Sequence, residues 1–127
     1  DFPTDDLIGA AGVTAIPHLG ASTPESEDNC AIMAAAQLTA YLERGEIKNS
    51  VNLPAAQLPA DFKTRVCVIH KNAEEVANAL STADLANLVS NTRGGVTYTV
   101  ADSNDAIDAD AIAKIPGVLR VRCLRHG

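Results

Sequence analysis

The sequence predicts an α+β fold, in which a βαββαβ module over residues 64–127 follows a long helix and the end of an α/β unit. Two observations predict it. First, residues 64–127 contain β-branched runs and helical patterns in the order strand, helix, strand, strand, helix, strand. This order places two helices on one face of an antiparallel sheet, as in ferredoxin-like domains. Second, apolar residues recur at helical spacing over Pro24–Arg44, directly after a strand-like run.

The first regular segment that we expect is a short strand over residues 12–16, which are rich in β-branched side chains. Pro17 ends this strand, because proline lacks the backbone N–H that an interior strand uses. Ser22 or Thr23 then serves as the N-cap of the following helix. Glu25 stands three residues after Ser22, as in a capping box.

His18 lies at the predicted turn between this strand and the helix, a position at which ligands bind in α/β sheets. An imidazole can supply or take a proton near neutral pH, so His18 is a candidate catalytic residue. The alternative is a histidine that only hydrogen-bonds the end of the strand. Ser22 and Thr23 are explained by capping, since no base is paired with them in the sequence.

The pattern over Pro24–Arg44 predicts a helix of about 20 residues, or roughly 30 Å, which Gly45 closes. Residues 55–63 show no periodicity and include or adjoin two prolines, which is typical of a linker. The sequence therefore divides into residues 1–54, a linker at 55–63, and a second domain at 64–127.

Within the second domain, residues 64–70 form a β-branched run that predicts a buried strand. Residues 73–80 show helical spacing, with Asn72 as a candidate N-cap. Two glycines between β-prone runs then predict a hairpin. It consists of a strand at 85–91, a turn at 94–95 and an alternating strand at 96–100.

The last part of the domain predicts one more helix and one more strand. Asp105 or Asp108 can cap a helix that carries Ile107 and Ile112, and the Pro-Gly pair at 116–117 stops it. Residues 118–124 then form the final strand.

Composition excludes several classes of partner. The net charge is −6: residues 1–63 carry nine acidic and three basic side chains, and residues 64–127 carry seven of each. An acidic chain without a basic stripe argues against nucleic-acid and anionic-membrane partners. Its four aromatic residues offer no stacking platform for single strands.

The cysteines Cys30, Cys67 and Cys123 are widely spaced and include no CxxC. They predict neither a disulfide framework nor a metal site. No apolar run approaches the about 20 residues that cross a bilayer, and the acidic N-terminal segment does not resemble a signal peptide. We therefore expect a cytoplasmic protein with reduced cysteines.

Two blocks of sequence resemble a known family. Residues 17–23 read Pro-His-Leu-Gly-Ala-Ser-Thr, and residues 45–54 read Gly-Glu-Ile-Lys-Asn-Ser-Val-Asn-Leu-Pro. Both resemble the NAD-dependent D-2-hydroxyacid dehydrogenases, and among them the D-3-phosphoglycerate dehydrogenases, which open L-serine biosynthesis. The resemblance covers residues 1–56 closely and the rest more loosely. It implies that the chain is a C-terminal fragment of such an enzyme, and that residues 64–127 are its ACT domain, a regulatory unit that senses amino acids.

The resemblance implies that His18 is the catalytic histidine, which protonates the keto oxygen as hydride arrives or removes the hydroxyl proton in the oxidative direction. Gly20 and Ala21 correspond to backbone close to the nicotinamide of NAD, where small residues permit approach. The alternative for Gly20 is a simple turn glycine. The parent enzyme would oxidise 3-phospho-D-glycerate to 3-phosphooxypyruvate.

Other parts of such an active site have no counterpart in this sequence. In the family, the glutamate that orients the histidine and the arginine that binds the substrate carboxylate belong to upstream segments. Residues 9–12 lack the spacing of a Gly-rich dinucleotide-binding turn. We therefore expect this chain alone to be inactive.

In the second domain, the resemblance places His70 and Asn72 among residues that bind an effector amino acid such as L-serine, with Asn87 as a further candidate. Imidazole and amide groups can bind both the ammonium and the carboxylate of an amino acid. The alternative is that Asn72 only caps the helix and His70 lies at an exposed strand end. Residues 73–75 (Ala-Glu-Glu) stand where the family usually has a glycine, and two carboxylates would repel the effector unless they point away.

Two other functions remain open. One is a free-standing ACT-type module for dimerisation or ligand binding without enzymatic activity. The other is a D-2-hydroxyacid dehydrogenase of different specificity, although the ACT-like tail favours the phosphoglycerate enzyme. We also expect a homo-oligomer, because ACT sheets commonly pair edge to edge and so remove exposed strand edges.

Overall fold

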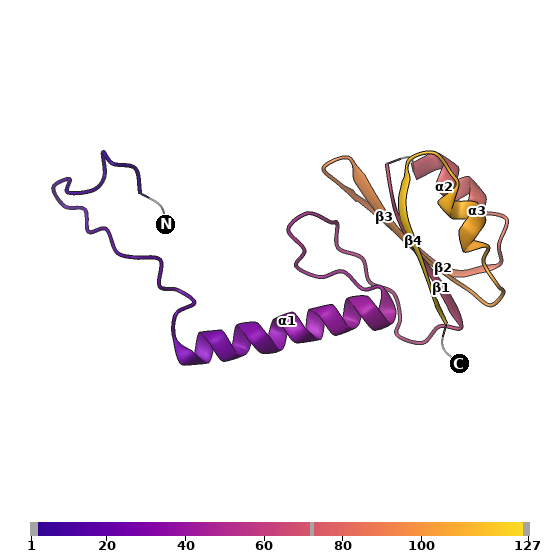
Figure 1. The fold of residues 1–127 in the computed structure, drawn as a ribbon, viewed down its shortest axis with the longest axis horizontal. Coiled ribbons are helices and arrows are strands. Elements are labelled where there is room, and N and C mark those ends of the chain that lie inside the picture. Colours follow the sequence, from indigo (N-terminus) through magenta and orange to yellow (C-terminus); the bar gives the residue numbers. More distant parts are fainter. Residues whose placement is uncertain (1–2, 72, 126–127) are drawn as a thin grey trace. The chain divides into compact units, whose positions relative to one another are not determined.

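The computed structural model describes residues 3–71 and 73–125 (Figure 1). The chain forms two compact units, Asp1–Ala36 and Gln37–Gly127. Helix α1 (Pro24–Arg44) begins in the first unit and ends in the second, and both of its ends lie where the sequence predicts them.

Turns and irregular segments precede α1 in the first unit. The predicted strand at residues 12–16 is wrong, since these residues pair with no other strand among those that the structure describes. β-branched residues favour a strand only where a partner accepts its backbone hydrogen bonds and its side chains find a surface.

Helix α1 begins at its predicted residue because Thr23 caps it. The backbone N–H of Ser26 donates to Thr23 Oγ1 at 3.2 Å. Thr23 is thus the N-cap, one of the two residues predicted for that role. The capping box predicted between Ser22 and Glu25 is wrong, because Ser26 occupies the third helical position after the cap.

The second unit contains a four-stranded sheet in the order β2-β3-β1-β4, with every neighbouring pair antiparallel. This confirms the ferredoxin-like βαββαβ prediction. The elements in chain order are β1 (Thr64–His70), α2 (Ala73–Leu80), β2 (Leu85–Arg93), β3 (Val96–Ser103), α3 (Ala109–Ala113) and β4 (Val118–Arg125).

The hairpin between β2 and β3 is confirmed, and both of its strands are longer than predicted. Gly94 and Gly95 have φ values of 57° and 76°, the backbone that a two-residue hairpin turn requires. Of the two candidate caps for α3, Asp108 is the N-cap: its Oδ1 accepts from the N–H of Ala111 at 3.0 Å.

One face of the sheet packs against α2 and α3 (Figure 1). Its strands contribute Val66 and Val68 from β1 and Ala101 from β3, and the helical side adds residues such as Val76 and Leu80. All five are almost completely buried. The apolar residues of α2, at helical spacing, thus complete this core.

The other face of the sheet has a second core, formed with the segment that follows α1. Cys67, Tyr98 and Val100 of the sheet pack with Ile47 and Ala56 of that segment. The segment doubles back on itself, because Ile47 and Ala56 form an isolated antiparallel bridge with backbone hydrogen bonds of 2.9 and 3.1 Å. The sheet is therefore covered on both faces by its own chain.

The residues predicted as a linker, 55–63, include the buried Ala56 and Phe62. Ala56 packs in the second core of the sheet domain (residues 64–125) and Phe62 lies against Arg65, whereas most of the other residues of 55–63 are exposed. The domain boundaries at residues 54 and 64 stay a prediction. Across 3–71 and 73–125, no helix is both long enough and apolar enough to span a membrane.

Candidate functional site

His18, the predicted catalytic residue, lies exposed in the irregular segment before α1. Gly20 and Ala21 form a turn next to it, in which the N–H of Ser22 donates to the carbonyl of Leu19 at 3.0 Å. A Cβ added to Gly20 would meet no atom within 4 Å. No atom among the described residues therefore requires a glycine at this position.

These residues do not by themselves form a site for NAD. A dinucleotide site needs a strand that leads into a glycine-rich turn and a helix N-terminus, and the strand expected before His18 is not formed. The roles of His18, Gly20 and Ala21 stay predictions.

His70, the first predicted effector residue, is fully buried at the end of β1. Its Nε2 lies 2.8 Å from Thr99 Oγ1, which in turn lies 2.8 Å from Ser90 Oγ. The alternative of an exposed strand end is wrong, because His70 is 0% exposed. Asn72 lies outside the described residues.

Asn87 lies in β2, on the opposite face of the sheet from His70. It is paired in register with Asp102, which is paired with Arg65, whereas His70 is paired with Thr97. The two rows are five residue steps apart along β1, a distance of about 17 Å. The structure therefore does not bring His70 and Asn87 together within one chain. Their effector role stays a prediction.

Asn87 lies next to a buried ion pair, formed by Arg65 and Asp102. Arg65 Nε donates to Asp102 Oδ1 at 2.6 Å and Nη2 donates to Oδ2 at 2.9 Å, a bidentate pair. Both side chains are at most 3% exposed. Asn87 Nδ2 donates to the same Asp102 Oδ2 at 3.3 Å. Arg65 also lies over the ring of Phe62, with its guanidinium carbon 4.1 Å from the ring centre.

Two arginines of the sheet hold the C-terminal end of α1. Arg65 Nη1 donates to the carbonyl of Arg44 at 2.8 Å. Arg122 donates to the carbonyls of Tyr41 and Leu42 at 3.2 and 2.8 Å and lies over the Tyr41 ring. The last carbonyls of a helix have no partner within it and carry partial negative charge, so cations are favourable there.

Gly45 brings α1 into contact with the middle of the sheet. Its φ is 66°, and its N–H donates to the Tyr41 carbonyl at 2.9 Å. A Cβ at this position would overlap Cys67 Sγ and lie 3.2 Å from the Tyr98 hydroxyl. Glycine is thus required twice here, for its backbone conformation and for the close approach.

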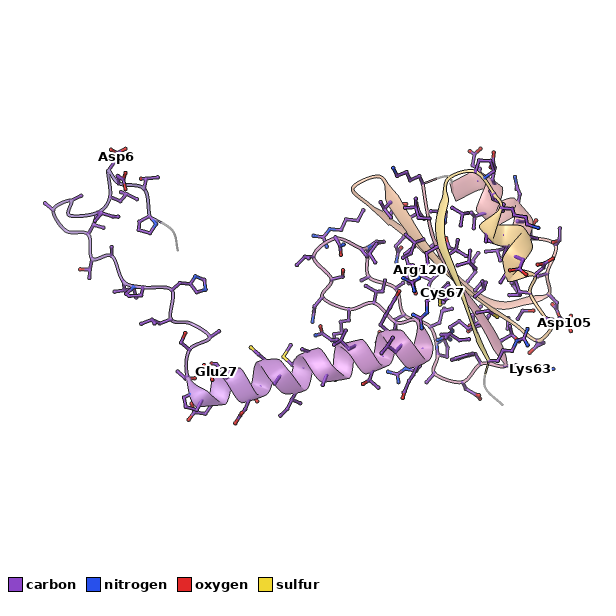
Figure 2. All side chains as sticks on the ribbon, in the orientation of Figure 1. Asp6, Glu27, Lys63, Cys67, Asp105 and Arg120 are labelled. Carbon is purple, nitrogen blue, oxygen red and sulfur yellow. The ribbon has the colours of Figure 1, made fainter. Side chains whose placement is uncertain are left out.

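Cys67 lies in the sheet domain (Figure 2), in this second core. Burial raises the pKa of its thiol, and a hydrogen bond with Tyr98 lowers it by less. Burial also raises the pKa of the Tyr98 phenol, with the nearby Cys67 acting in the same direction. Both groups are therefore neutral at pH 7 and act as core residues.

Comparison with known proteins gives one consistent result. No protein-family model matches the chain. Over 136 residues, 95% of this chain is 30% identical to D-3-phosphoglycerate dehydrogenase of Escherichia coli. The chain is homologous to D-3-phosphoglycerate dehydrogenases. D-3-phosphoglycerate dehydrogenase 1 of Saccharomyces cerevisiae is 28% identical over 84% of the chain, and the Haemophilus influenzae enzyme 30% over 85%.

The chain spans between a quarter and a third of the length of these relatives, 32%, 25% and 29% respectively. The homology confirms the resemblance predicted from residues 17–23 and 45–54. It extends well beyond residue 56, so it includes the sheet domain as well as the segment with His18.

Sequence reasoning missed the Arg65–Asp102 pair and the two arginines at the end of α1. A signal was present: each member of the pair interrupts an otherwise apolar or small-residue strand at a position whose neighbours face a core. A charge at such a position needs a buried partner, and Arg65 and Asp102 have opposite charge. Which sheet face they share depended on register, which the sequence did not reveal.

Proposed function

We propose that this chain is the C-terminal part of an NAD-dependent D-3-phosphoglycerate dehydrogenase. The parent oxidises 3-phospho-D-glycerate to 3-phosphooxypyruvate in the cytoplasm, as a step of L-serine biosynthesis. The observation that carries the proposal is the 30% identity to a D-3-phosphoglycerate dehydrogenase over 95% of the chain, joined to a ferredoxin-like sheet domain of the kind expected for an ACT unit.

His18 is the proposed proton donor and acceptor at the substrate oxygen. Its exposure leaves the ring accessible to groups supplied by the rest of the parent. Gly20 and Ala21 are the proposed contacts to the nicotinamide, and NAD would supply hydride acceptance when bound. The resemblance assigns the glycine-rich dinucleotide turn and the arginine for the substrate carboxylate to segments upstream of Asp1, so the 127-residue chain alone is expected to be inactive.

An activity assay tests this proposal. The protein translated from the complete coding sequence is expected to reduce NAD with 3-phospho-D-glycerate, and His18→Ala to lower kcat by about 10²–10⁴-fold, the range for loss of a general acid–base group. Glu27→Gln, an exposed change on α1, is the matched control and leaves kcat unchanged. Full activity of His18→Ala, or NADH turnover by the 127-residue chain, contradicts the proposal.

We further propose that the sheet domain is an ACT domain that binds L-serine and regulates the parent. The amide of Asn87 and the end of β1 near His70 are the proposed contacts. Glu74 and Glu75 are exposed in the first turn of α2, so their carboxylates are directed to solvent and away from the core. This lessens the repulsion expected from residues 73–75.

An amide NMR titration of the 127-residue chain with L-serine tests this binding. Saturable shifts at residues 69–71 and at Asn87 support it, and Asn87→Ala is expected to abolish them. D-Serine is the control ligand for a stereospecific site. Absence of shifts at millimolar L-serine contradicts the sensing role and leaves assembly as the function of this domain.

A second candidate function is a stand-alone assembly module without enzymatic activity. It is favoured by the second unit, in which the sheet has a core on each face built from its own chain. Strands β2 and β4 form the sheet edges, where strands of a second copy can pair. Sedimentation tests both candidates: a homo-oligomer is expected, and a 13.2 kDa monomer at high concentration contradicts it.

A further inference from the structure

Arg65 connects three parts of the second unit: strand β3, the end of α1 and the segment between α1 and β1. Four of its N–H groups are used: two on Asp102 of β3, one on the carbonyl of Arg44 at the end of α1, and one on the carbonyl of Pro59 at 2.5 Å. The side chain is 1% exposed. Its guanidinium is planar and rigid, so one of these bonds cannot change direction without altering the others.

The same carboxylate extends this connection to the edge of the sheet. Asp102 Oδ2 accepts both from Arg65 Nη2 at 2.9 Å and from Asn87 Nδ2 at 3.3 Å. Asn87 lies in β2, an edge strand, and is partly exposed. The amide at the edge and the last turn of α1 are therefore joined by one carboxylate and one guanidinium.

Because the Arg65–Asp102 pair is buried, its hydrogen bonds respond to the loss of the bond from Asn87. In a low-dielectric interior a carboxylate depends on its few hydrogen bonds, and the loss of one strengthens or redirects the rest. If another acceptor takes the Asn87 Nδ2–H that bonds Asp102 Oδ2, this oxygen loses a donor and depends more on Arg65. The geometry of the bond from Arg65 to the Arg44 carbonyl then changes, because this bond and the bond to Asp102 come from the same rigid guanidinium.

We infer that Asn87, Asp102 and Arg65 form a relay that couples the β2 edge of the sheet to the C-terminal end of α1. A group with an acceptor oxygen at the edge, such as a carboxylate or a backbone carbonyl, accepts the hydrogen bond of the Asn87 amide. This weakens or redirects the hydrogen bond from Arg65 to the end of α1. Arg65 is the positioning residue of this relay. The inference concerns residues 44–102 alone and does not depend on the proposed dehydrogenase function.

Hydrogen exchange and NMR of the 127-residue chain test the relay. Asn87→Asp places a second carboxylate beside Asp102 and is expected to shift the Arg65 Nε–H resonance. It should also accelerate amide exchange at Gly45 and Glu46, which close the end of α1, by about tenfold. Asn87→Ala removes the donor without adding charge, and is expected to give the same Arg65 shift with a smaller acceleration of about threefold.

The matched control is Ala86→Asp, which adds the same charge at the adjacent exposed residue of β2. It should leave Gly45 and Glu46 unchanged. The relay is overturned if Arg65 Nε–H shifts in the Asn87 variants while Gly45 and Glu46 exchange as in the parent chain. It is also overturned if the acceleration is shared by Val66 in the core, or if Ala86→Asp accelerates exchange equally.

Discussion

The hydroxyl of Tyr98 donates a 2.7 Å hydrogen bond to the carbonyl of Gly45, 53 residues earlier in the chain. Tyr98 lies in β3 and is 1% exposed, and Gly45 directly follows α1. The bond supplies a partner for a helix-terminal carbonyl that is buried away from water. It fixes the end of α1 on the sheet at the point where the glycine allows closest approach.

Removing this hydroxyl should destabilise the sheet domain. Tyr98→Phe leaves the Gly45 carbonyl buried without its donor, so the free energy of unfolding is expected to fall by about 1–3 kcal/mol. Urea unfolding followed by circular dichroism measures it. Tyr41→Phe, which keeps the ring beneath Arg122, is the control with a smaller effect. Equal stability of Tyr98→Phe and the parent chain would show that the bond contributes nothing.

Gly45→Ala should be more damaging than an ordinary glycine substitution. Alanine disfavours the positive φ of this position, at a cost of about 1–2 kcal/mol, and its Cβ overlaps Cys67 Sγ. The double variant Gly45→Ala, Cys67→Ala removes the overlap but not the backbone cost. Thermal unfolding of both variants, with Cys67→Ala alone as reference, separates the two terms. If the destabilisation of the double variant equals the sum of the two single losses, the new Cβ does not overlap Cys67 Sγ.

The Arg65–Asp102 pair should be costly to break from one side only. Asp102→Leu leaves a buried guanidinium without its carboxylate, and the expected loss is about 3–5 kcal/mol. The double variant Arg65→Met, Asp102→Leu should recover part of this, because the two apolar side chains need no partner, while the carbonyls of Arg44 and Pro59 lose their donor. Urea unfolding of the four proteins forms a double-mutant cycle. Additive losses would show that the two charges do not interact.

Elements whose bounds depend on local chemistry were predictable. Helix α1 begins at a capping threonine and ends at a glycine. Strand β1 coincides with a continuous β-branched run, and α2 follows the 3.6-residue period of its apolar side chains. The strand expected at residues 12–16 failed because a strand also requires a partner, which local sequence does not specify.

The buried polar clusters could not be predicted for the same physical reason. Asn87 and Asp102 are brought together by strand register, and a shift of one residue would place them on opposite faces. The contact of Arg65 with the Arg44 carbonyl depends further on how the segment 45–63 folds back over the sheet. Residue types indicated candidates such as His70 and Asn87, whereas their separation on two faces emerged only from topology.

Alkaline pH should destabilise the sheet domain through Cys67. Its thiol pKa is raised by burial in the folded state, whereas an unfolded thiol titrates near about 8.5. Above that pH the folded chain holds a proton that the unfolded chain has lost, so the free energy of unfolding falls as pH rises, by at most about 1.4 kcal/mol per pH unit. Urea unfolding between about pH 7 and 9 stays about one pH unit below the pKa of an unfolded tyrosine and measures the slope.

Cys67→Ala removes the group responsible, so its unfolding free energy should change less with pH over the same range, whatever its value at pH 7. Cys123→Ala is the control, because it deletes a thiol from a half-buried position of β4 and retains Cys67. Parallel pH profiles for Cys67→Ala and the parent chain would show that the Cys67 proton is not linked to folding. A flatter profile for Cys67→Ala alone would place the linkage at the contact between the end of α1 and the sheet, where the thiol faces Gly45.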